Sequence, residues 1–198
     1  MYGLVNRAIQ DLAVHLGGGQ AWAEIKSRAG VDVESLVSMD VYPDDVTYRL
    51  VEAASDVFRL PAEEVLRAFG RHWILYTGRK GYGAVFETMG RTLPEFLLNL
   101  DAMHARLSLS MPELRPPSFV CQQEGEEQIR LQYWSEREGL APMVVGLLEG
   151  LGDLFELEVT VVHDVSRLAG HDHDEFVVHY LPRRAVAGGG GIGRVTQG

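Results

Sequence analysis

The sequence predicts an α+β fold, with a helical N-terminal subdomain followed by a four-stranded antiparallel sheet and a packed helix. Apolar residues in the first half recur every three or four positions, as on the buried face of helices, whereas a period of two appears after Pro117. The 198 residues fit one domain, and 46% hydrophobic against 23% charged residues is the balance of a chain that folds.

Helices are expected over much of the first 107 residues. Asp44 and Asp45 are expected to cap one of them, because carboxylates near a helix start satisfy free amides and the dipole. Pro61 is expected to open the next helix, and the segment from Gly78 to Gly83 to end it. The apolar spacing predicts helices over about residues 4–16, 22–29, 44–58, 61–77 and 92–107.

The second half is expected to form the sheet. An acidic turn at residues 124–127 joins the first two strands, and a helix over about 139–155 precedes the last two. We predict strands at 118–122, 128–134, 158–163 and 175–180. The domain is expected to cover residues 1–182, with the helical subdomain over about 1–60 and the site-bearing part over about 61–182, before a flexible Gly-rich tail at 183–198.

Charge and composition exclude several classes of function. A formal charge of −10 and a pI near 5.1 disfavour nucleic acid, since phosphate binding needs clusters of Lys and Arg. We expect a cytoplasmic protein without membrane insertion, because neither a secretory signal nor a run of roughly 20 apolar residues is present. The single cysteine, Cys121, excludes an internal disulfide and is expected to pack as a small hydrophobe.

Three polar side chains alternate at the end of the second predicted strand. Tyr133, Ser135 and Arg137 would share one face of an extended segment, where a phenol, a hydroxyl and a guanidinium can donate to anionic oxygens. This spacing predicts a carboxylate clamp. The alternative is the polar outer face of a sheet.

One histidine interrupts an apolar helix face. Leu97, Leu100, His104 and Leu107 are spaced by three, four and three residues, which places the imidazole toward the core. A hydrogen-bonded core histidine is one reading of this pattern, and an axial ligand of haem iron is the other. An apolar slot, an axial ligand and cationic donors at the edge together are what haem requires.

Five segments of the chain together resemble a known family. They are MYGLVN at 1–6, YRLVEAAS at 48–55, FLLNLDAMH at 96–104, RPPSF at 115–119 and YWSEREGL at 133–140. In these segments the sequence resembles the haem nitric oxide/oxygen-binding (H-NOX) family, which is similar to the sensor domain of soluble guanylate cyclase. The resemblance implies that haem b (iron protoporphyrin IX) lies between the helical subdomain and the sheet. It implies that His104 ligates the iron, that Tyr133, Ser135 and Arg137 bind the propionates, and that Pro116 and Pro117 press on the porphyrin.

The resemblance also indicates the distal side of the haem. Members that bind oxygen stably place a tyrosine on the helix after the clamp, and residues 139–146 contain none. Apolar side chains cannot donate to bound oxygen, although the Trp73 indole could. The residues expected to line this side are Val5, Ile9, Trp73, Met143 and Leu147.

We therefore expect a gas sensor and no enzyme, since Ser135 has no histidine at catalytic spacing. Nitric oxide, or CO, is expected to bind ferrous haem, weaken the bond to His104 and move its helix. Because no output domain follows residue 198, the signal is expected to reach a separate protein, and the resemblance implies a histidine kinase or a cyclic-di-GMP enzyme. The alternatives are a haem-free module for a small carboxylate and an oxygen-binding member of the family.

Other histidines admit further readings. His171 and His173, each followed by an aspartate, are expected to lie in a solvated turn, with a metal site as the alternative. His72, beside Trp73, is expected to pack, with a second axial ligand of oxidised haem as the alternative.

Overall fold

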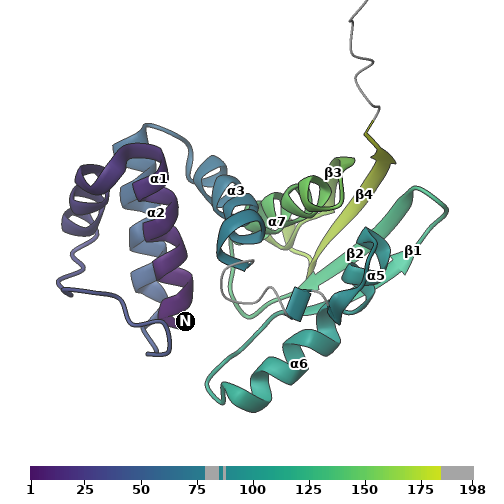
Figure 1. Cartoon of the computed structure of the whole chain (residues 1–198), viewed down its shortest axis with the longest axis horizontal. Helices are drawn as coiled ribbons and strands as arrows, with labels where there is room; N and C mark the ends of the chain where they lie inside the picture. Colours follow the sequence, from purple (N-terminus) through teal and green to yellow (C-terminus); the bar gives the residue numbers. More distant parts are fainter. Residues whose placement is uncertain (79–84, 87, 184–198) are drawn as a thin grey trace, which may run out of the picture.

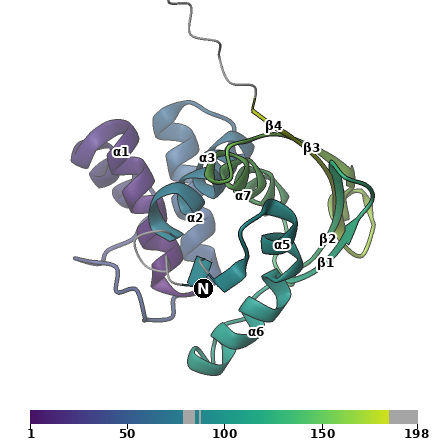
Figure 2. The same ribbon diagram turned by 45° about the vertical axis from the view of Figure 1, so that its right-hand side comes forward.

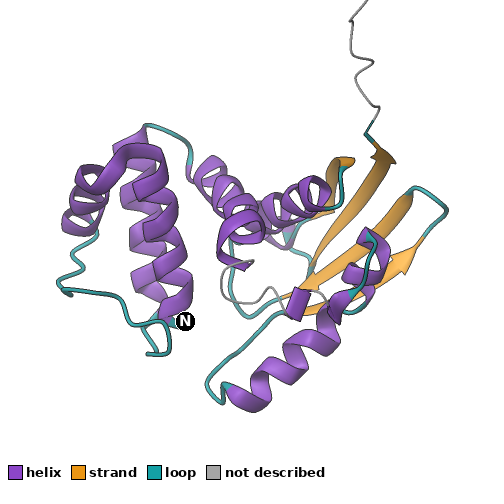
Figure 3. Cartoon of the chain, in the orientation of Figure 1, coloured by secondary structure: helices purple, strands orange, loops and turns teal. Residues whose placement is uncertain are grey.

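The computed structural model describes residues 1–78, 85, 86 and 88–183, and it confirms the α+β fold (Figures 1 and 3). The N-terminal helices lie at one end and the sheet at the other. The helices are α1 (Gly3–Arg28), α2 (Asp44–Phe58), α3 (Ala62–His72), the π-helix η1 (Trp73–Gly78), α5 (Leu93–Leu98), α6 (Leu100–Ser110), α7 (Ala141–Leu154) and the 3-10 turn η2 (Arg167–Ala169). The strands are β1 (Ser118–Gln123), β2 (Gln128–Trp134), β3 (Leu157–Val165) and β4 (Asp174–Pro182).

The helical subdomain is built on α1 and α2. The two helices expected over about residues 4–16 and 22–29 together form α1, and they meet at a break at Gly18, whose non-helical backbone (φ 72°, ψ −176°) glycine adopts without strain. The start of α2 is where the sequence predicts it, but Pro43 holds the N-cap position and no side chain caps the helix. Asp44 and Asp45 occupy the first turn instead, which corrects their expected role as caps.

Helices α3 and α7 touch through their backbones. A Cβ atom on Gly70 would lie 2.1 Å from the carbonyl oxygen of Met143, and one on Gly146 would lie 1.9 Å from that of Arg67. Only glycine allows so close an approach. The crossing therefore fixes α3, which follows the helical subdomain, against α7, which packs on the sheet.

The sheet is antiparallel with strand order β1-β2-β4-β3. Figure 2 shows it as a curved layer, with α7 and α5 on its concave side. Leu131 pairs with Phe176 across β2 and β4, and both are fully buried against that side. The alternation predicted from the sequence is therefore present in the inner face of the sheet.

Two predicted helices are interrupted. The helix expected over residues 92–107 is divided at Asn99, whose side-chain amide donates to the carbonyl oxygens of Met89 (2.8 Å) and Glu95 (3.0 Å). The helix that begins after Pro61 changes to π-helical geometry at Trp73. Residues 79–83, expected to end it, and the tail from 184 lie outside the described residues.

Within the described part of the chain, every helix is too short or too polar to cross a membrane.

Candidate functional site

A cavity of about 250 Å³ lies between the helical subdomain and the sheet, and its lining is largely apolar. Its walls come from the start of α1, from η1 and α6, from the segment 111–117 and from β1, β2 and α7. The sequence-predicted residues that it brings together are Val5, Trp73, His104, Pro116, Pro117, Tyr133, Ser135, Arg137, Met143 and Leu147.

His104 lies on α6, half-buried, with its ring stacked on Phe119 at a centroid distance of 5.6 Å and an interplanar angle of 22°. Its Nδ1 atom is buried without a hydrogen-bond partner among the described residues. Burial lowers the pKa of the imidazole, and the nearby Asp101 carboxylate opposes this only in part. The ring is therefore neutral at physiological pH, the form that donates a lone pair to a metal.

The rest of α6 explains why the histidine is exposed to the cavity. None of its residues is fully buried, because the inner face of the helix lines the cavity through Met103, His104 and Leu107. Leu97, expected on the same helical stripe, belongs to α5 and is buried against the sheet. The break at Asn99 thus separates a packed helix from the helix that carries the imidazole.

Tyr133 and Ser135 also line the cavity, and the Tyr133 ring lies 5.4 Å from the ring of Phe119, on which His104 stacks. Burial raises the pKa of the Tyr133 phenol, which outweighs the opposing hydrogen bond with Ser135, so the phenol keeps its proton as a donor. The strand ends at Trp134, and Ser135 lies in the following loop, where its Oγ accepts from the Arg137 amide at 3.0 Å. The prediction that residues 133–137 form one extended segment is therefore wrong, because β2 ends at Trp134 and the hydrogen bond between Ser135 and Arg137 closes a turn.

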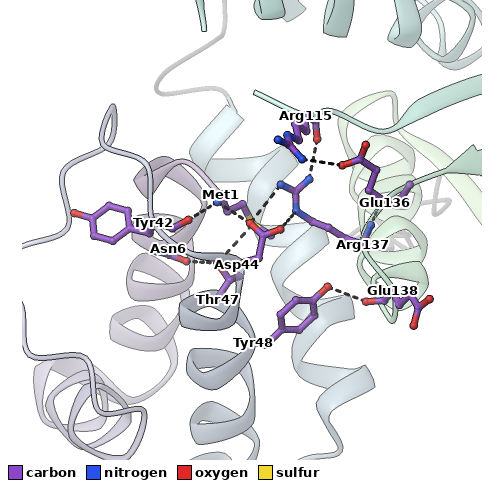
Figure 4. Close-up of polar contacts among 11 residues, drawn as sticks. Met1, Asn6, Tyr42, Asp44, Thr47, Tyr48, Arg115, Glu136, Arg137 and Glu138 are labelled. Carbon is purple, nitrogen blue, oxygen red and sulfur yellow. Dashed lines mark hydrogen bonds and ion pairs between the residues drawn. The ribbon is translucent and has the colours of Figure 1, made fainter. Parts of the chain in front are cut away.

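The side chain of Arg137 is mostly buried, with 16% of it exposed. Its Nη1 donates to the Arg115 carbonyl at 2.7 Å, and its Nε donates to Asp44 at 2.8 Å. Figure 4 shows Asp44 between Arg137 and the N-terminal amine of Met1, which also donates to it, at 2.7 Å. The contact between Asp44 and Arg137 could not be predicted from the sequence, because no local pattern links residues 93 positions apart.

The remaining walls suit a flat apolar ligand. Trp73 opens the π-helix and packs edge-on against Phe69, with ring centroids 6.1 Å apart. Short π-helical segments of this kind are frequent at functional sites. Lining residues that the sequence analysis did not single out include Met1, Tyr2, Leu4, Phe86, Met111, Leu140 and Val144.

Ile9 is the one predicted site residue that the structure places elsewhere. It is 2% exposed in the core of the helical subdomain and lines a separate cavity of about 20 Å³ with Leu12 and Phe69. The turn of α1 that carries Val5 reaches the main cavity, and the next turn does not.

The other histidines and the cysteine also lie away from the cavity lining. His72 is buried and stacks on Tyr76 at 4.7 Å, while His173 stacks on Trp134 at 4.3 Å. Among the described residues, no three His, Cys, Asp or Glu side chains form a group that could hold a metal ion. Burial raises the pKa of the Cys121 thiol to about 11, which keeps it protonated.

The residues present fit a haem. The cavity combines apolar walls, a neutral imidazole whose buried Nδ1 has no hydrogen-bond partner in the part of the chain that the structure describes, and a guanidinium with two hydroxyl groups beside it. These are an axial ligand for iron and a set of donors for two carboxylates.

Comparison with known proteins agrees with this geometry. A family model described as Haem-NO-binding matches residues 2–163. Soluble guanylate cyclase gcy-31 of Caenorhabditis elegans is 29% identical over 184 residues, which are 92% of this chain and 26% of that protein. Guanylate cyclase soluble subunit beta-2 of Rattus norvegicus is 32% identical over 132 residues, 64% of this chain and 19% of that protein. The chain thus spans only a minor part of the length of these relatives.

Solved structures share the fold. A mutant of an H-NOX protein from S. oneidensis in the Fe(II) ligation state has a TM-score of 0.85 at 20% identity, covering 93% of this chain and 98% of its own. A mutant of T. Tengcongensis H-NOX has a TM-score of 0.79 at 23% identity, covering 91% of this chain and 97% of its own. With the family model matched over most of its length, the chain belongs to the Haem-NO-binding family and contains an H-NOX domain, a sensor fold for haem-bound gases.

Proposed function

We propose that this chain binds haem b through His104, holds the haem propionates with Tyr133, Ser135 and Arg137, and senses nitric oxide, with CO as a second ligand. The observation that carries the proposal is one cavity with a neutral imidazole in one wall and a buried guanidinium in another. Neither group alone is specific, but their combination around apolar walls matches the three chemical parts of haem.

Haem held by His104 would supply a ferrous iron that could bind a diatomic gas, with a bond to the histidine that the gas could weaken. The role of this chain would be to hold the imidazole and to change conformation when the bond between His104 and the iron weakens. Helix α6 packs mainly on β1 and α5 and has no fully buried residue. Loosening of the bond to His104 would leave α6 held mainly by its contacts with β1 and α5, and the gas can shift conformations only by its differential affinity for them.

The walls favour nitric oxide and CO over stable oxygen binding. Val5, Met143 and Leu147 offer no strong hydrogen-bond donor to a bound gas. Trp73 and Tyr2 are the lining side chains on this side with an N–H or O–H, so an oxygen-binding member of the family is the second candidate.

The test is the absorption spectrum of the haem-reconstituted, reduced protein under air and then with nitric oxide. We expect an unchanged ferrous spectrum under air and a five-coordinate adduct with nitric oxide. A stable oxygen complex would support the second candidate, and a nitric oxide adduct that stays six-coordinate would contradict release of His104. Absence of any Soret band would favour a haem-free carboxylate-binding module.

His104→Gly tests the ligand directly. We expect the variant to lose the five-coordinate ferrous spectrum and to regain it with added imidazole. Ala105→Gly is the matched control, because it weakens the same helix at an exposed position outside the cavity lining. An unaltered spectrum in His104→Gly without imidazole would refute the assignment.

For the output, we propose a separate effector protein, a histidine kinase or a cyclic-di-GMP enzyme, which contacts the exposed outer face of α6. This part of the proposal rests on the resemblance and on the exposure of α6, where Leu109 is 86% exposed. The test is whether a candidate effector co-purifies with the ferrous protein, and whether the amount that co-purifies changes when nitric oxide is added.

A further inference from the structure

The clamp residue Arg137 already binds a carboxylate of the chain itself. Its Nε lies 2.8 Å from Oδ2 of Asp44 and its Nη2 lies 3.4 Å from Oδ1, so the guanidinium grips the carboxylate with two of its nitrogens (Figure 4). Asp44 begins α2 of the helical subdomain, whereas Arg137 lies in the loop after β2. The contact therefore joins the two parts of the fold at the edge of the cavity.

The contact with Asp44 leaves some of the N–H donors of the Arg137 guanidinium available. Arginine has five N–H donors, of which Asp44 engages two and the Arg115 carbonyl engages one. The remaining donors can bind a second carboxylate while Asp44 stays in place. Asp44 and Arg115 together thus restrain a long side chain that would otherwise sample many rotamers.

The Asp44 carboxyl group is charged at neutral pH, where Arg137 would bind a propionate. Burial acts to raise the pKa of its carboxyl, but hydrogen bonds from the Met1 amine and from Arg137 outweigh this and hold the pKa below its ordinary value. The carboxylate is therefore a permanent partner of Arg137 at neutral pH.

The neighbouring Asp45 shows that this contact is not a general property of the helix start. Asp45 lies in the same first turn, is 64% exposed and pairs with Arg49 of its own helix at 3.2 Å. One turn further along α2, the Tyr48 hydroxyl donates to the Glu138 carbonyl at 2.9 Å. Asp44 and Tyr48 thus face the loop 135–138, and Asp45 does not contact it.

We propose that Asp44 is a positioning residue for the carboxylates of haem, which fixes the Arg137 guanidinium and ties α2 to the edge of the haem site. The inference rests on the proposed function, because it requires that Arg137 binds a propionate. It makes the helical subdomain part of the haem clamp, although no residue of that subdomain belongs to the Tyr133, Ser135 and Arg137 set.

A competing arrangement has the opposite consequence. If Asp44 withheld Arg137 from the propionate, removal of the carboxylate would strengthen haem binding. The positioning role predicts that removal weakens haem binding, because the guanidinium must then lose more freedom when the propionate binds.

The experiment is a double-mutant cycle read as the rate of haem transfer from the full chain to an excess of a haem-scavenging apoprotein. We expect Asp44→Asn to release haem about three- to tenfold faster than the wild type, and Asp45→Asn, which removes the same charge from the same turn, to stay within about twofold. In an Arg137→Ala background, Asn at position 44 should cause no further acceleration, because the group through which Asp44 acts is gone.

Three results would overturn the inference: slower release from Asp44→Asn, equal release from the Asp44 and Asp45 variants, or the same acceleration with and without Arg137. Circular dichroism checks that each variant folds, and Asp44→Ser repeats the cycle if Asp44→Asn does not. A wild-type protein without a Soret band would instead defeat the proposed function, so the two failures are distinguishable.

Discussion

The His104 and Arg137 walls of the cavity are held in opposite ways. His104 lies on a helix with no fully buried residue, and its Nδ1 has no hydrogen-bond partner in the described part of the chain. Arg137 is bound by Asp44 from α2 and by the Arg115 carbonyl, and its own amide donates to Ser135. The wall with Arg137 is thus fixed by contacts from several elements, whereas the wall with His104 is held by fewer contacts.

The sharpest difference should appear in hydrogen exchange of the haem-free protein. Helix α7 has seven buried residues and α6 has none, so we expect the amides of residues 141–154 to exchange at least about 100-fold more slowly than those of 100–110. Mass spectrometry of peptic peptides measures this. Equal protection of the two helices would contradict the loose attachment of α6, and haem should reduce the difference by anchoring His104.

Loss of the fixed wall should have the next largest effect. Arg137→Ala removes the mostly buried cation that is proposed to pair with a haem propionate, and loss of one partner of such a pair costs about 3 kcal/mol, or roughly 100-fold in haem affinity. A haem titration followed at the Soret band measures it. Arg106→Ala removes the same charge from an exposed position on α6 and should leave the affinity unchanged. Similar affinities for the two variants would refute the clamp.

The helix crossing behind the fixed wall offers a third test. In Gly146→Ala the new methyl group meets the Arg67 carbonyl, and we expect a loss of about 1–3 kcal/mol, or roughly 2–10 °C in Tm. Gly19→Ala is the control, because it meets no atom within 4 Å and should leave Tm equal or slightly higher. Thermal unfolding followed by circular dichroism separates the two outcomes.

The smallest expected effect is a shift in the titration of Asp44. Its pKa lies below the ordinary value of 3.8 and should rise in Arg137→Ala, which carbon-13 NMR of the carboxyl can follow. Because the folded-state pKa is the lower one, the contact stabilises the fold above about pH 3.8 and this contribution is lost as the pH falls through the folded-state pKa. An unchanged titration in the variant would show that the Met1 amine alone lowers the pKa.

Much of the fold could be predicted from the sequence, because apolar spacing reports directly which face of an element is buried. The strands and the helices α2, α3 and α7 follow this spacing closely. The division at Asn99 could not be predicted in the same way. It depends on an amide side chain that finds the Met89 carbonyl, a tertiary contact across a segment whose path the sequence does not reveal.

Membership of the cavity lining could be predicted where residue chemistry and the family resemblance agree, as at His104 and Tyr133. It was not predictable where distance along the chain hides a contact, as between Asp44 and Arg137. Ile9 shows a third difficulty, because it lies on nearly the same face of α1 as Val5 but about 6 Å further along the helix axis, where the neighbouring core replaces the cavity.

The glycine contacts between α3 and α7 have a consequence for which positions of this chain can change. Where two helices meet backbone to backbone, their spacing does not depend on the size of any side chain, so the frame around Trp73 and Met143 stays constant when those residues change. Exchanges such as Met143→Tyr can then add a hydrogen-bond donor to the cavity while the helix spacing is kept. Under the proposed function, gas selectivity and integrity of the fold would depend on different positions of the same helix.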